Sequence, residues 1–395
     1  MQYICTMAII LFDNKFRDNL APLCLNKAVA DLRMGILTIQ ERWGKLLNNA
    51  IYIHTSALLQ PLYPIPAAAM HVWIDAAVLP TEELLKLIDG LKPGQALVDE
   101  FGLIAGISSI AFDSFDPSSC DTLFTELIPI DHIKRIEFPW DLIQLNGQFI
   151  PYDFKLLTKG KKSQPISPTV QVAQSADIFI EEGAKLEFCI LNSTTGPIYI
   201  GKNAEVMEGT TIRGPFSLGD HSVLKMNSRV YGATTLGPYC MGGGEIKNAI
   251  MMGYSNKAHD GYLGDAVIGE WCNFGAGSSN SNLKNSAAAV AVWAMNLKKM
   301  VLVGQKCGVI MGDYSRVAIN SSINTGSVIG LCCSVFGAGL LPKRISNFSF
   351  GIEGKKYNIQ NAVADINNWK MMKGKSLSEI EINILNQLHQ SIEKQ

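Results

Sequence analysis

The sequence has few charged residues and almost no net charge. Charged residues make up 17% of its 395 residues, and 34 basic side chains against 35 acidic ones leave a net charge of −1 at pH 7. Nucleic acids and anionic lipid surfaces attract proteins that carry a basic face. The balance therefore argues against nucleic acid or a membrane as the main partner. Long disorder is excluded too, because it requires low hydrophobicity and 47% of the residues are hydrophobic.

Paired cysteine motifs and long apolar runs are also missing. None of the nine cysteines forms a Cys-x-x-Cys pair, which argues against a disulfide framework or a zinc knuckle and favours reduced thiols in a cytoplasmic protein. No apolar run reaches the roughly 18 residues of a membrane-spanning helix. The apolar run within residues 1–11 has no basic region before it and no cleavage site, so it predicts a buried first strand and not a signal peptide.

The length favours two or three domains, at about 150 residues each. Apolar runs of strand length at 8–11, 50–53, 71–74 and 94–98 alternate with helix-like stretches, one over 35–47 and one that begins at Thr81. This alternation is typical of βαβ units and a parallel sheet. Since residues 158–168 combine charge, Ser and Pro, we predict an α/β domain over residues 1–165.

A period of six governs the next part of the chain. Aliphatic residues recur at every sixth position: Ile200, Val206, Ile212, Leu218, Leu224, Val230 and Leu236. The series resumes at Ile246 and Met252, at Ile268 and Phe274, and from Val317 to Leu341. Hexads predict a left-handed parallel β-helix, in which three hexads form one triangular coil and the aliphatic side chains fill the prism. Gly often follows the aliphatic residue, and we expect it to permit the backbone angles of the corners. An ordinary β-sandwich would not explain the period, so we assign residues 166–345 to the β-helix.

Two segments depart from the period. Residues 283–309 alternate in polarity and carry Trp293 and a Lys298-Lys299 pair, which predicts a hairpin or loop that projects from the prism. Residues 346–395 form a C-terminal extension. Within it, 376–392 has the pattern of an amphipathic helix opened by Ser376 or Ser378.

Catalytic candidates are few because the chain has only six histidines. A prism has flat faces, so we expect sites where neighbouring subunits meet, in a homotrimer. His221 lies in a regular hexad turn and is expected at the surface. His259 lies in an irregular loop beside Asp260 and Tyr262, and is either a catalytic base or a solvated loop histidine. A prism-type metal site built from three imidazoles would need one more histidine in the repeat.

The segment 255–283, SNKAHDGYLGDAVIGEWCNFGAGSSNSNL, resembles the acetyltransferase core of the GlmU-like family. These bifunctional enzymes combine glucosamine-1-phosphate acetyltransferase with N-acetylglucosamine-1-phosphate uridyltransferase. The family shows a catalytic His before Tyr-x-Gly-Asp, then Asn-x-Gly-Ala-Gly, then a further Asn. The phrases GYSNKAHDGYLG, GEWCN and FPWDLI are most similar to a subgroup of sugar nucleotidyltransferases from Bacteroidetes-type bacteria.

The resemblance assigns roles to single positions. It implies His259 as the general base, and Ala276 and Asn282 as contacts of acetyl-CoA or another acyl-CoA. It implies a sugar-phosphate site that is formed by Arg229, Lys247, Tyr262 and Asn273. Two positions depart from the family, because Leu283 stands where it has Tyr, and Asp313 where it has a Ser near the cofactor.

The first domain resembles the nucleotidyltransferase half of the family, a Rossmann-like α/β fold, without its Gly-rich phosphate loop. Residues 12–20 read FDNKFRDNL, with no glycine to let the backbone approach a phosphate closely. The resemblance implies Arg17 and Lys27 as nucleotide-binding cations. It implies Asp75 as a Mg²⁺ ligand, with Asp141 or Asp153 as a second one. An aspartate at a strand end that caps the following turn is an equally open interpretation of Asp75.

Three functions remain open at this point. The first is acyl-CoA-dependent N-acyl transfer to an amino-sugar phosphate on the β-helix, beside a degenerate nucleotidyltransferase domain. The second is sugar-1-phosphate nucleotidyl transfer with Mg²⁺, in which the β-helix only forms the trimer. The third is non-catalytic binding of a sugar nucleotide. In all three the partners are sugar phosphates and nucleotides, in the cytoplasm.

Overall fold

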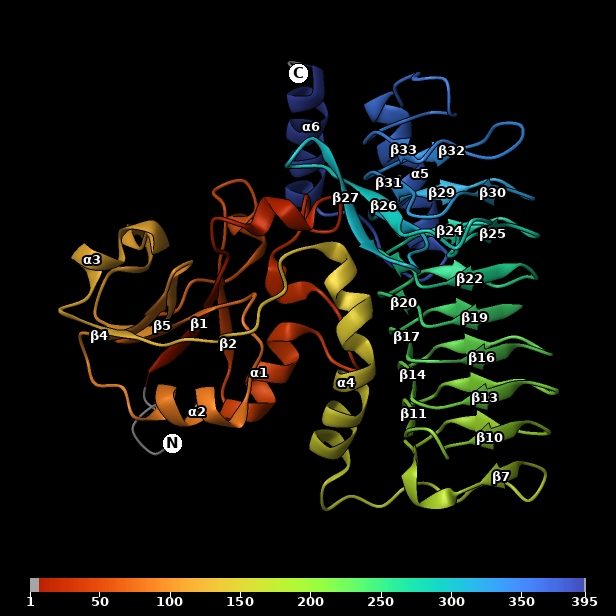
Figure 1. The fold of residues 1–395 in the computed structure, drawn as a ribbon, viewed down its shortest axis with the longest axis horizontal. Coiled ribbons are helices and arrows are strands. Elements are labelled where there is room, and N and C mark those ends of the chain that lie inside the picture. Colours follow the sequence, from red (N-terminus) through yellow and green to blue (C-terminus); the bar gives the residue numbers. More distant parts are fainter. Residues whose placement is uncertain (1–6, 394–395) are drawn as a thin grey trace. The chain divides into compact units, whose positions relative to one another are not determined.

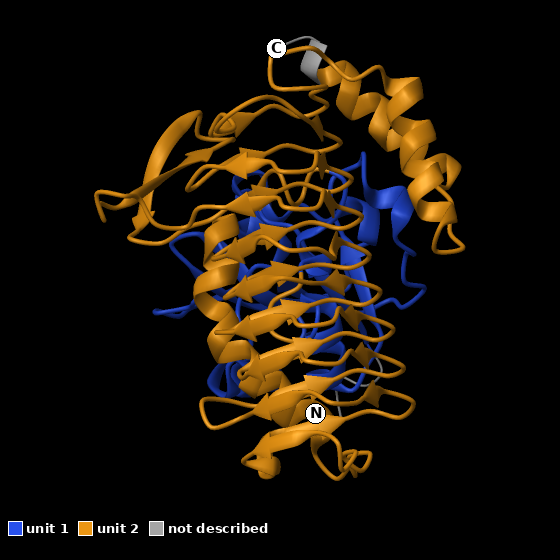
Figure 2. Ribbon diagram, turned by 90° about the vertical axis from the view of Figure 1, so that its right-hand side faces the viewer, with its two compact units in different colours: residues 1–20, 26–32, 37–137 blue, residues 21–25, 33–36, 138–395 orange. Residues whose placement is uncertain are grey.

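The computed structural model describes residues 7–393, and these form two compact units (Figure 2). Unit 1 comprises residues 1–20, 26–32 and 37–137, and unit 2 comprises residues 21–25, 33–36 and 138–395. Residues 1–6, which hold part of the predicted first apolar run, lie outside the described residues. The remainder of that run forms a fully buried strand, as predicted.

Unit 1 is built around a mixed sheet. Its strand order is β2-β1-β3-β5-β4-β6. The strands are β1 (Ala8–Phe12), β2 (Ile51–His54), β3 (His71–Asp75), β4 (Gln95–Asp99), β5 (Gly102–Ser108) and β6 (Glu126–Pro129). The strands β1, β2 and β3 are parallel, whereas β5 pairs antiparallel with both β3 and β4. The predicted parallel pairing is therefore confirmed for β1, β2 and β3 and for β4 with β6, whereas β5 departs from it. The connection between β4 and β5 is only Glu100-Phe101, and so short a link allows only an antiparallel pair.

The helices of unit 1 begin where side chains can cap them. In α1 (Ile39–Leu47) the Thr38 hydroxyl accepts the Glu41 N–H, and the Glu41 carboxylate accepts the Thr38 N–H. In α2 (Glu82–Asp89) the Thr81 hydroxyl accepts the Leu84 N–H. A short helix, α3 (Cys120–Leu123), precedes β6. Both predicted helices are confirmed, and α1 begins four residues later than predicted because Thr38 provides the capping box.

Unit 2 winds into a left-handed parallel β-helix with three faces, which confirms the hexad prediction (Figure 1). The face we call the open face contains β7 (Gln171–Ala173), β10 (Ile190–Asn192), β13 (Thr211–Arg213), β16 (Arg229–Tyr231), β19 (Glu245–Lys247) and β22 (Tyr262–Gly264), followed by the pair β25 (Ser279–Asn280) and β30 (Ser322–Ile323).

The other two faces are also parallel sheets. The α4 face contains β8 (Ile178–Ile180), β11 (Ile198–Ile200), β14 (Phe216–Leu218), β17 (Thr234–Leu236), β20 (Ile250–Met251), β23 (Val267–Ile268), β28 (Ile310–Met311), β31 (Val328–Ile329) and β33 (Arg344–Ile345). The C-terminal face contains β9 (Lys185–Leu186), β12 (Glu205–Val206), β15 (Val223–Leu224), β18 (Met241–Gly242), β21 (Asn256–Lys257), β24 (Asn273–Phe274), β29 (Arg316–Val317) and β32 (Ser334–Val335).

The prism is filled by the residues of the hexad series. The aliphatic residues from Ile200 to Leu236, and those from Val317 to Leu341, all belong to one buried cluster. One assignment is wrong. On β20 the inward residue is Met251, which pairs with the inward Leu236, whereas Met252 lies beyond the strand. The coil from Leu236 to Met251 spans 15 residues and the next one, from Met251 to Ile268, spans 17, against 18 for three hexads, so the phase shifts.

The glycines that follow inward residues serve close stacking of the coils. A Cβ on Gly219 would lie 2.5 Å from the Gly237 carbonyl carbon in the next coil, and one on Gly237 would lie 2.2 Å from the Met252 oxygen. Neither glycine has a positive φ, whereas His221 and Tyr239 at the corners do. The expected role of these glycines at the corners is therefore wrong. A side chain is excluded because the backbone of the next coil lies too close.

Helices and a hairpin cover two of the faces. The helix α4 (Pro139–Thr158) packs on β17, β20 and β23, although the predicted domain boundary near residue 165 lies after it. The helices α5 (Ile359–Met371) and α6 (Glu379–Glu393) pack on Trp271 and Tyr314 in one cluster, and Ser378 caps α6 as predicted. The predicted hairpin is confirmed as β26 (Val290–Ala294) and β27 (Lys299–Gly304).

Two further findings concern membranes and thiols. Among the described residues, no helix combines the length and the apolar character that crossing a membrane requires. The eight cysteines in this part of the chain form no disulfide, and seven of them are buried.

A candidate active site on the β-helix

Three predicted residues share the open face of the β-helix. In-register pairing places Arg229, Glu245 and Tyr262 side by side at the start of β16, β19 and β22, and places Tyr231 beside Lys247 two residues further along. Their side chains point outward, because the residues between them, such as Val230 and Ile246, fill the prism. Figure 2 shows this face toward the viewer, with its strands in a ladder.

Glu245 contacts Arg229 and Tyr231 on this face. The Tyr231 hydroxyl donates to Glu245 Oε1 at 2.6 Å, and Arg229 Nε lies 4.0 Å from Glu245 Oε2. The hydrogen bond to Glu245 raises the pKa of Tyr231. Lys247 Nζ lies 5.6 Å from the centre of the Tyr231 ring. Two cations beside one carboxylate leave a positive patch that suits a phosphate group.

The hydroxyl of Tyr262 joins a second polar cluster. Asn282 Nδ2 donates to the Tyr262 hydroxyl at 3.0 Å and also to Asp265 Oδ2, and Asn248 Nδ2 donates to Asp265 Oδ1 at 2.6 Å. Burial, followed by the nearby Asp265 charge, raises the pKa of Tyr262. The predicted Tyr262 and Asn282 are therefore in direct contact, and Tyr262 is a neutral donor or acceptor at neutral pH.

His259 lies at the edge where the C-terminal face turns into the open face. We call the stack of turns along this line the His259 edge; it contains residues 187–189, 207–210, 225–228, 243–244, 258–261, 275–278 and 318–321. His259 is exposed, three residues before Tyr262. Ala276 occupies the next turn along the edge, and the Gly277 N–H donates to the Asp260 carbonyl at 3.1 Å. His259 and Ala276 are thus one coil apart.

Asn273 is the predicted β-helix site residue that lies on another face. It is part of β24 on the C-terminal face, where it pairs with Asn256 and Arg316. The structure therefore brings together Arg229, Lys247, Tyr262 and Asn282 on the open face, with His259 and Ala276 at its edge. His221 is exposed and stacks on Tyr239 with ring centres 4.8 Å apart, as expected of a surface residue.

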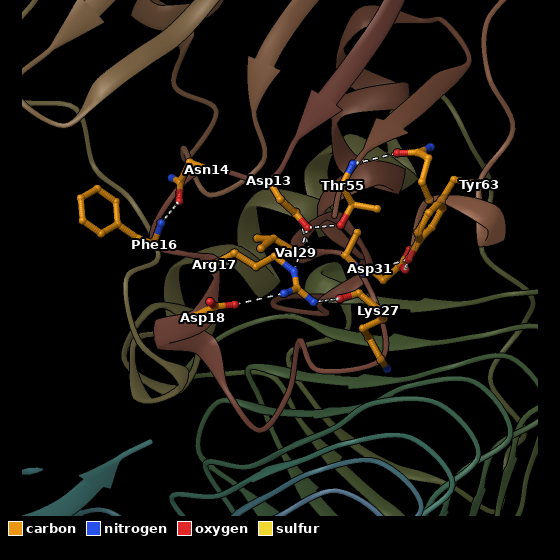
Figure 3. A network of polar contacts seen from close by, with 12 residues as sticks. Asp13, Asn14, Phe16, Arg17, Asp18, Lys27, Val29, Asp31, Thr55 and Tyr63 are labelled. Atoms are coloured by element: carbon orange, nitrogen blue, oxygen red, sulfur yellow. Dashed lines mark hydrogen bonds and ion pairs between the residues drawn. The ribbon is translucent and has the colours of Figure 1, made fainter. Parts of the chain in front are cut away.

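In unit 1, Arg17 and Lys27 are part of a dense polar network (Figure 3). Arg17 Nε lies 3.0 Å from Asp13 Oδ2, and its other nitrogens donate to Asp18 Oδ1 at 3.2 Å and to the Lys27 carbonyl at 3.4 Å. Asp13 also accepts the Thr55 hydroxyl at 2.6 Å. The two predicted cations are therefore adjacent, and the Arg17 guanidinium is held by acidic partners of the same unit.

Asp75 lies at the end of β3 and is engaged on both oxygens. Oδ1 accepts the Ala77 N–H at 2.9 Å, and Oδ2 accepts Asn14 Nδ2 at 2.8 Å and lies 3.5 Å from Arg135 Nε. Arg135 also donates to Asp99 Oδ2 at 2.5 Å, so one guanidinium joins two carboxylates. Burial raises the pKa of Asp75 to about 6.

These contacts do not fit a Mg²⁺ site at Asp75. Magnesium needs carboxylate oxygens that face it together with water in octahedral geometry, and here Arg135 already supplies the counter-charge. Asp141 caps α4 by accepting the Phe138 N–H, and Asp153 accepts the Ile36 N–H, both within unit 2. In the described part of the chain no three acidic, His or Cys side chains form a metal-binding group.

A cavity of about 570 Å³ lies at the carboxyl end of β2. It is lined by residues that include His54, Thr55, Tyr63, Phe112 and Asp113. Parallel strands in α/β sheets bind ligands beyond their carboxyl ends. This cavity shares Thr55 with the Asp13–Arg17 network, so the two features are adjacent within unit 1.

Comparison with known proteins matches both parts of the chain. Residues 9–162 match the family model of sugar nucleotidyl transferases. The bifunctional protein GlmU of Methanococcus maripaludis is 29% identical over 210 residues, which cover 53% of this chain and 44% of that protein. A bifunctional sugar-1-phosphate nucleotidylyltransferase/acetyltransferase of Sulfurisphaera tokodaii is 32% identical over 169 residues, 39% of either chain. Over these parts the chain is similar to GlmU-like proteins.

These similarities support the family resemblance, while the Bacteroidetes subgroup stays a prediction. The matched parts cover less than half the length of these curated relatives. Among solved structures, an Arabidopsis UDP-N-acetylglucosamine acyltransferase is matched at 14% identity over 58% of this chain and 91% of that one, with a TM-score of 0.26.

Asp313 and Leu283, the two residues that depart from the GlmU-like pattern, lie at different depths in the structure. Asp313 is buried, and its Oδ1 accepts the Glu270 N–H at 2.9 Å, so it fixes a coil of the prism. Leu283 is partly exposed and forms an isolated bridge with Lys306. Tyr231, Asp265 and Lys257 have no predicted role. Asp265 could have been found, because it is the Asp of the Tyr-x-Gly-Asp motif.

Proposed function

We propose that the β-helix transfers an acyl group from acyl-CoA, in the simplest case acetyl-CoA, to the amine of an amino-sugar phosphate. The observation that supports this most is the arrangement of His259 at the edge of a face on which Arg229, Lys247 and Tyr262 gather. A base beside a cationic phosphate site is what N-acylation of a phosphorylated amine requires.

Each residue has a distinct task in this proposal. Lys247 and Arg229 bind the sugar phosphate through charge-assisted hydrogen bonds, and Tyr262 contacts the sugar with Asn282 orienting its hydroxyl. The His259 imidazole takes the proton that the amine loses as its nitrogen bonds to the acyl carbon. The carbon–sulfur bond breaks in the same reaction, and the leaving thiolate takes up the proton from the imidazolium and departs as free thiol.

The acyl donor has a suitable place along the His259 edge. The turn 275–277 reads Gly-Ala-Gly, and Ala276 is exposed one coil from His259. Small side chains let a thioester arm approach the backbone, and backbone amides can stabilise the oxyanion that develops on the acyl oxygen. Asn273 lies on another face and is left without a role on this chain's own site.

We also propose that a second and third copy complete the site in a homotrimer. Large apolar side chains are exposed along the His259 edge, and they include Phe188, Met226 and Ile319 at 64%, 62% and 69% exposure. A row of this kind is unusual on a monomer and marks an interface. Its coincidence with His259 places the catalytic candidate where a neighbouring copy would contribute, in a cytoplasmic protein whose thiols stay reduced.

The test compares thiol release by matched histidine variants. Wild-type protein with acetyl-CoA and a panel of amino-sugar 1-phosphates should release free thiol only when the acceptor is present. His259→Ala should lower this rate at least about 100-fold, as expected for loss of a general base. His221→Ala removes an exposed histidine from another corner of the same β-helix and should leave the rate unchanged. Equal rates in wild type and His259→Ala would refute the proposed base.

For unit 1 we propose binding of a sugar nucleotide or sugar phosphate without Mg²⁺-dependent turnover. The support is the Arg135 guanidinium between Asp75 and Asp99, together with the cavity beside Thr55. Nucleoside triphosphates, sugar phosphates and sugar nucleotides should raise the melting temperature through binding, while no pyrophosphate forms with Mg²⁺. Pyrophosphate release from any nucleoside triphosphate and sugar 1-phosphate would restore nucleotidyl transfer as the function of unit 1.

A further inference from the structure

A lysine occupies a core position of the prism. Lys257 on β21 pairs in register with Gly242 on β18, and a Cβ on Gly242 would point at the side chains of Leu224, Leu236 and Ile246. On this face Leu224 is the inward residue two coils before Lys257, and Phe274 is the inward residue of the coil after it. Lys257 is only 1% exposed. By register, Lys257 therefore points into the prism at the position that Leu224 and Gly242 occupy in the coils before it.

The ammonium group of Lys257 reaches the turn that carries His259. Its Nζ donates to the His259 carbonyl and to the Asp260 carbonyl, the latter at 3.1 Å. A buried charge is costly and is seldom kept for stability alone, because an apolar residue of similar volume is often neutral or stabilising in its place. The charge stands two residues before the proposed base.

In other turns of the His259 edge, a neutral serine hydroxyl within the turn donates to a backbone carbonyl. In 225–228 the Ser228 hydroxyl donates to the Lys225 carbonyl at 2.5 Å, and in 318–321 the Ser321 hydroxyl donates to the Ala318 carbonyl at 2.7 Å. In 258–261 the corresponding position is Gly261, which has no hydroxyl. The serines bind the first carbonyl of their turns, whereas Lys257 reaches the second and third carbonyls of 258–261 from inside the prism, so the hold on this turn differs from that in the neighbouring coils.

We infer that Lys257 is a positioning residue, which fixes the turn 258–261 through two backbone carbonyls and so presents the His259 imidazole at the edge of the open face. This inference rests on the proposed role of His259. Lys257 itself is buried beneath the turn and touches no reacting atom.

The charge state of Lys257 depends on few groups. The neighbouring strands β18 and β24 contribute Met241, Gly242, Asn273 and Phe274, none of which titrates, and Asp260 in the turn is the charged group that acts on it. Burial lowers the pKa of Lys257 to about 8 and Asp260 opposes this shift. The lysine is therefore charged at pH 7 and becomes neutral as the pH rises through 8, which weakens its bonds to the carbonyls.

The test is Lys257→Met, which keeps an unbranched side chain one atom shorter and removes the charge. We expect kcat to fall by about tenfold to 100-fold, since small misplacement of a catalytic group has effects of this size, while KM for the sugar phosphate stays within about twofold. The fall of kcat above pH 8 in wild type should be absent in the variant, and Lys257→Arg should recover part of the rate.

Hydrogen exchange supplies a readout that needs no turnover. Peptides that cover residues 258–262 should exchange faster in Lys257→Met than in wild type, although the melting temperature is equal or higher. Leu224→Ala is the matched control, because it changes an inward residue of the same face, lowers the melting temperature and should leave both kcat and exchange of 258–262 unchanged. Unchanged exchange and kcat in Lys257→Met would overturn the inference.

The two proposals fail in different ways. If His259→Ala retains full turnover, the proposed function fails, and the exchange of 258–262 still decides whether Lys257 holds the turn. If His259→Ala is inactive and Lys257→Met is as active as wild type across the pH range, the function stands and the positioning role is overturned.

Discussion

At the scale of single residues, Arg135 is the shared ion-pair partner of two buried carboxylates, those of Asp75 and Asp99. Its side chain is 3% exposed, and those of Asp75 and Asp99 are 2% and 9% exposed. Removing one partner of a buried ion pair typically costs about 3–5 kcal/mol. We predict that Arg135→Met lowers the free energy of unfolding by about this amount at pH 7, as measured by denaturant titration.

The pH dependence of that loss follows from Asp75. Its pKa is about 6 in the folded protein and below 4 in the unfolded chain. The folded state therefore binds more protons between these values, and stability from this group falls as the pH rises from about 4 to 6. The Arg135→Met loss should accordingly be smaller at pH 4.5 than at pH 7. A loss that is the same at both values would contradict the assignment of Arg135 as the counter-charge.

Glu245 should moderate the affinity of the open face for phosphate. Its carboxylate lies near Arg229 and accepts from Tyr231, so it competes with a bound phosphate for Arg229. We predict that Glu245→Gln binds an amino-sugar phosphate about two- to fivefold more tightly, since exposed pairs contribute up to about 1 kcal/mol. The gain should shrink at high salt. Calorimetry at two ionic strengths checks this, and weaker binding by Glu245→Gln would show that Glu245 contacts the ligand itself.

At the scale of elements, the spacing of the coils makes a sharp distinction between two glycines. Gly219 and Gly253 both follow an α4-face strand, but a Cβ on Gly219 would lie 2.5 Å from the next coil, whereas one on Gly253 would have only contacts of 3.4 Å or more. We predict that Gly219→Ala lowers the free energy of unfolding by about 1–3 kcal/mol. Gly253→Ala should be neutral or slightly stabilising. Equal effects in thermal unfolding would contradict close stacking as the reason for these glycines.

Much of the fold could be predicted from the sequence because its signals are local. The hexads give the prism, Thr38, Thr81 and Ser378 give helix starts, and the alternation after residue 283 gives the hairpin. The direction of β5 was missed, because it depends on a two-residue turn that looks like any other loop. The phase near Met251 was missed because Gly242 and Lys257 occupy inward positions where an aliphatic residue is expected.

The candidate site was only partly predictable, for a geometric reason. Arg229, Glu245 and Tyr262 meet because consecutive coils place them in register. The family resemblance identified Arg229 and Tyr262 as site residues, but not Glu245. Asn273 follows the motif equally well but points from the C-terminal face. The Asp75–Arg135 pair joins residues 60 positions apart, and no local pattern indicates such a contact.

At the scale of the whole molecule, the exposed apolar row along the His259 edge predicts the state of assembly. Met226 and Ile319 lie in turns on either side of the His259 turn and are 62% and 69% exposed. We predict that wild type is a trimer and that Met226→Glu with Ile319→Glu dissociates it, because two buried charges oppose the interface. Light scattering after size-exclusion chromatography gives the mass. A doubly substituted trimer would place the interface on another face.

Acylation of an amino-sugar phosphate by the β-helix, with His259 as the base, can be tested directly. The most direct measurement is mass spectrometry of the sugar phosphate after incubation with acetyl-CoA and wild-type protein, His259→Ala or His221→Ala. We expect a product heavier by one acetyl group with wild type and His221→Ala, and unchanged sugar phosphate with His259→Ala. Acetylated product in all three samples, or in none across the panel of amino-sugar phosphates, would contradict it.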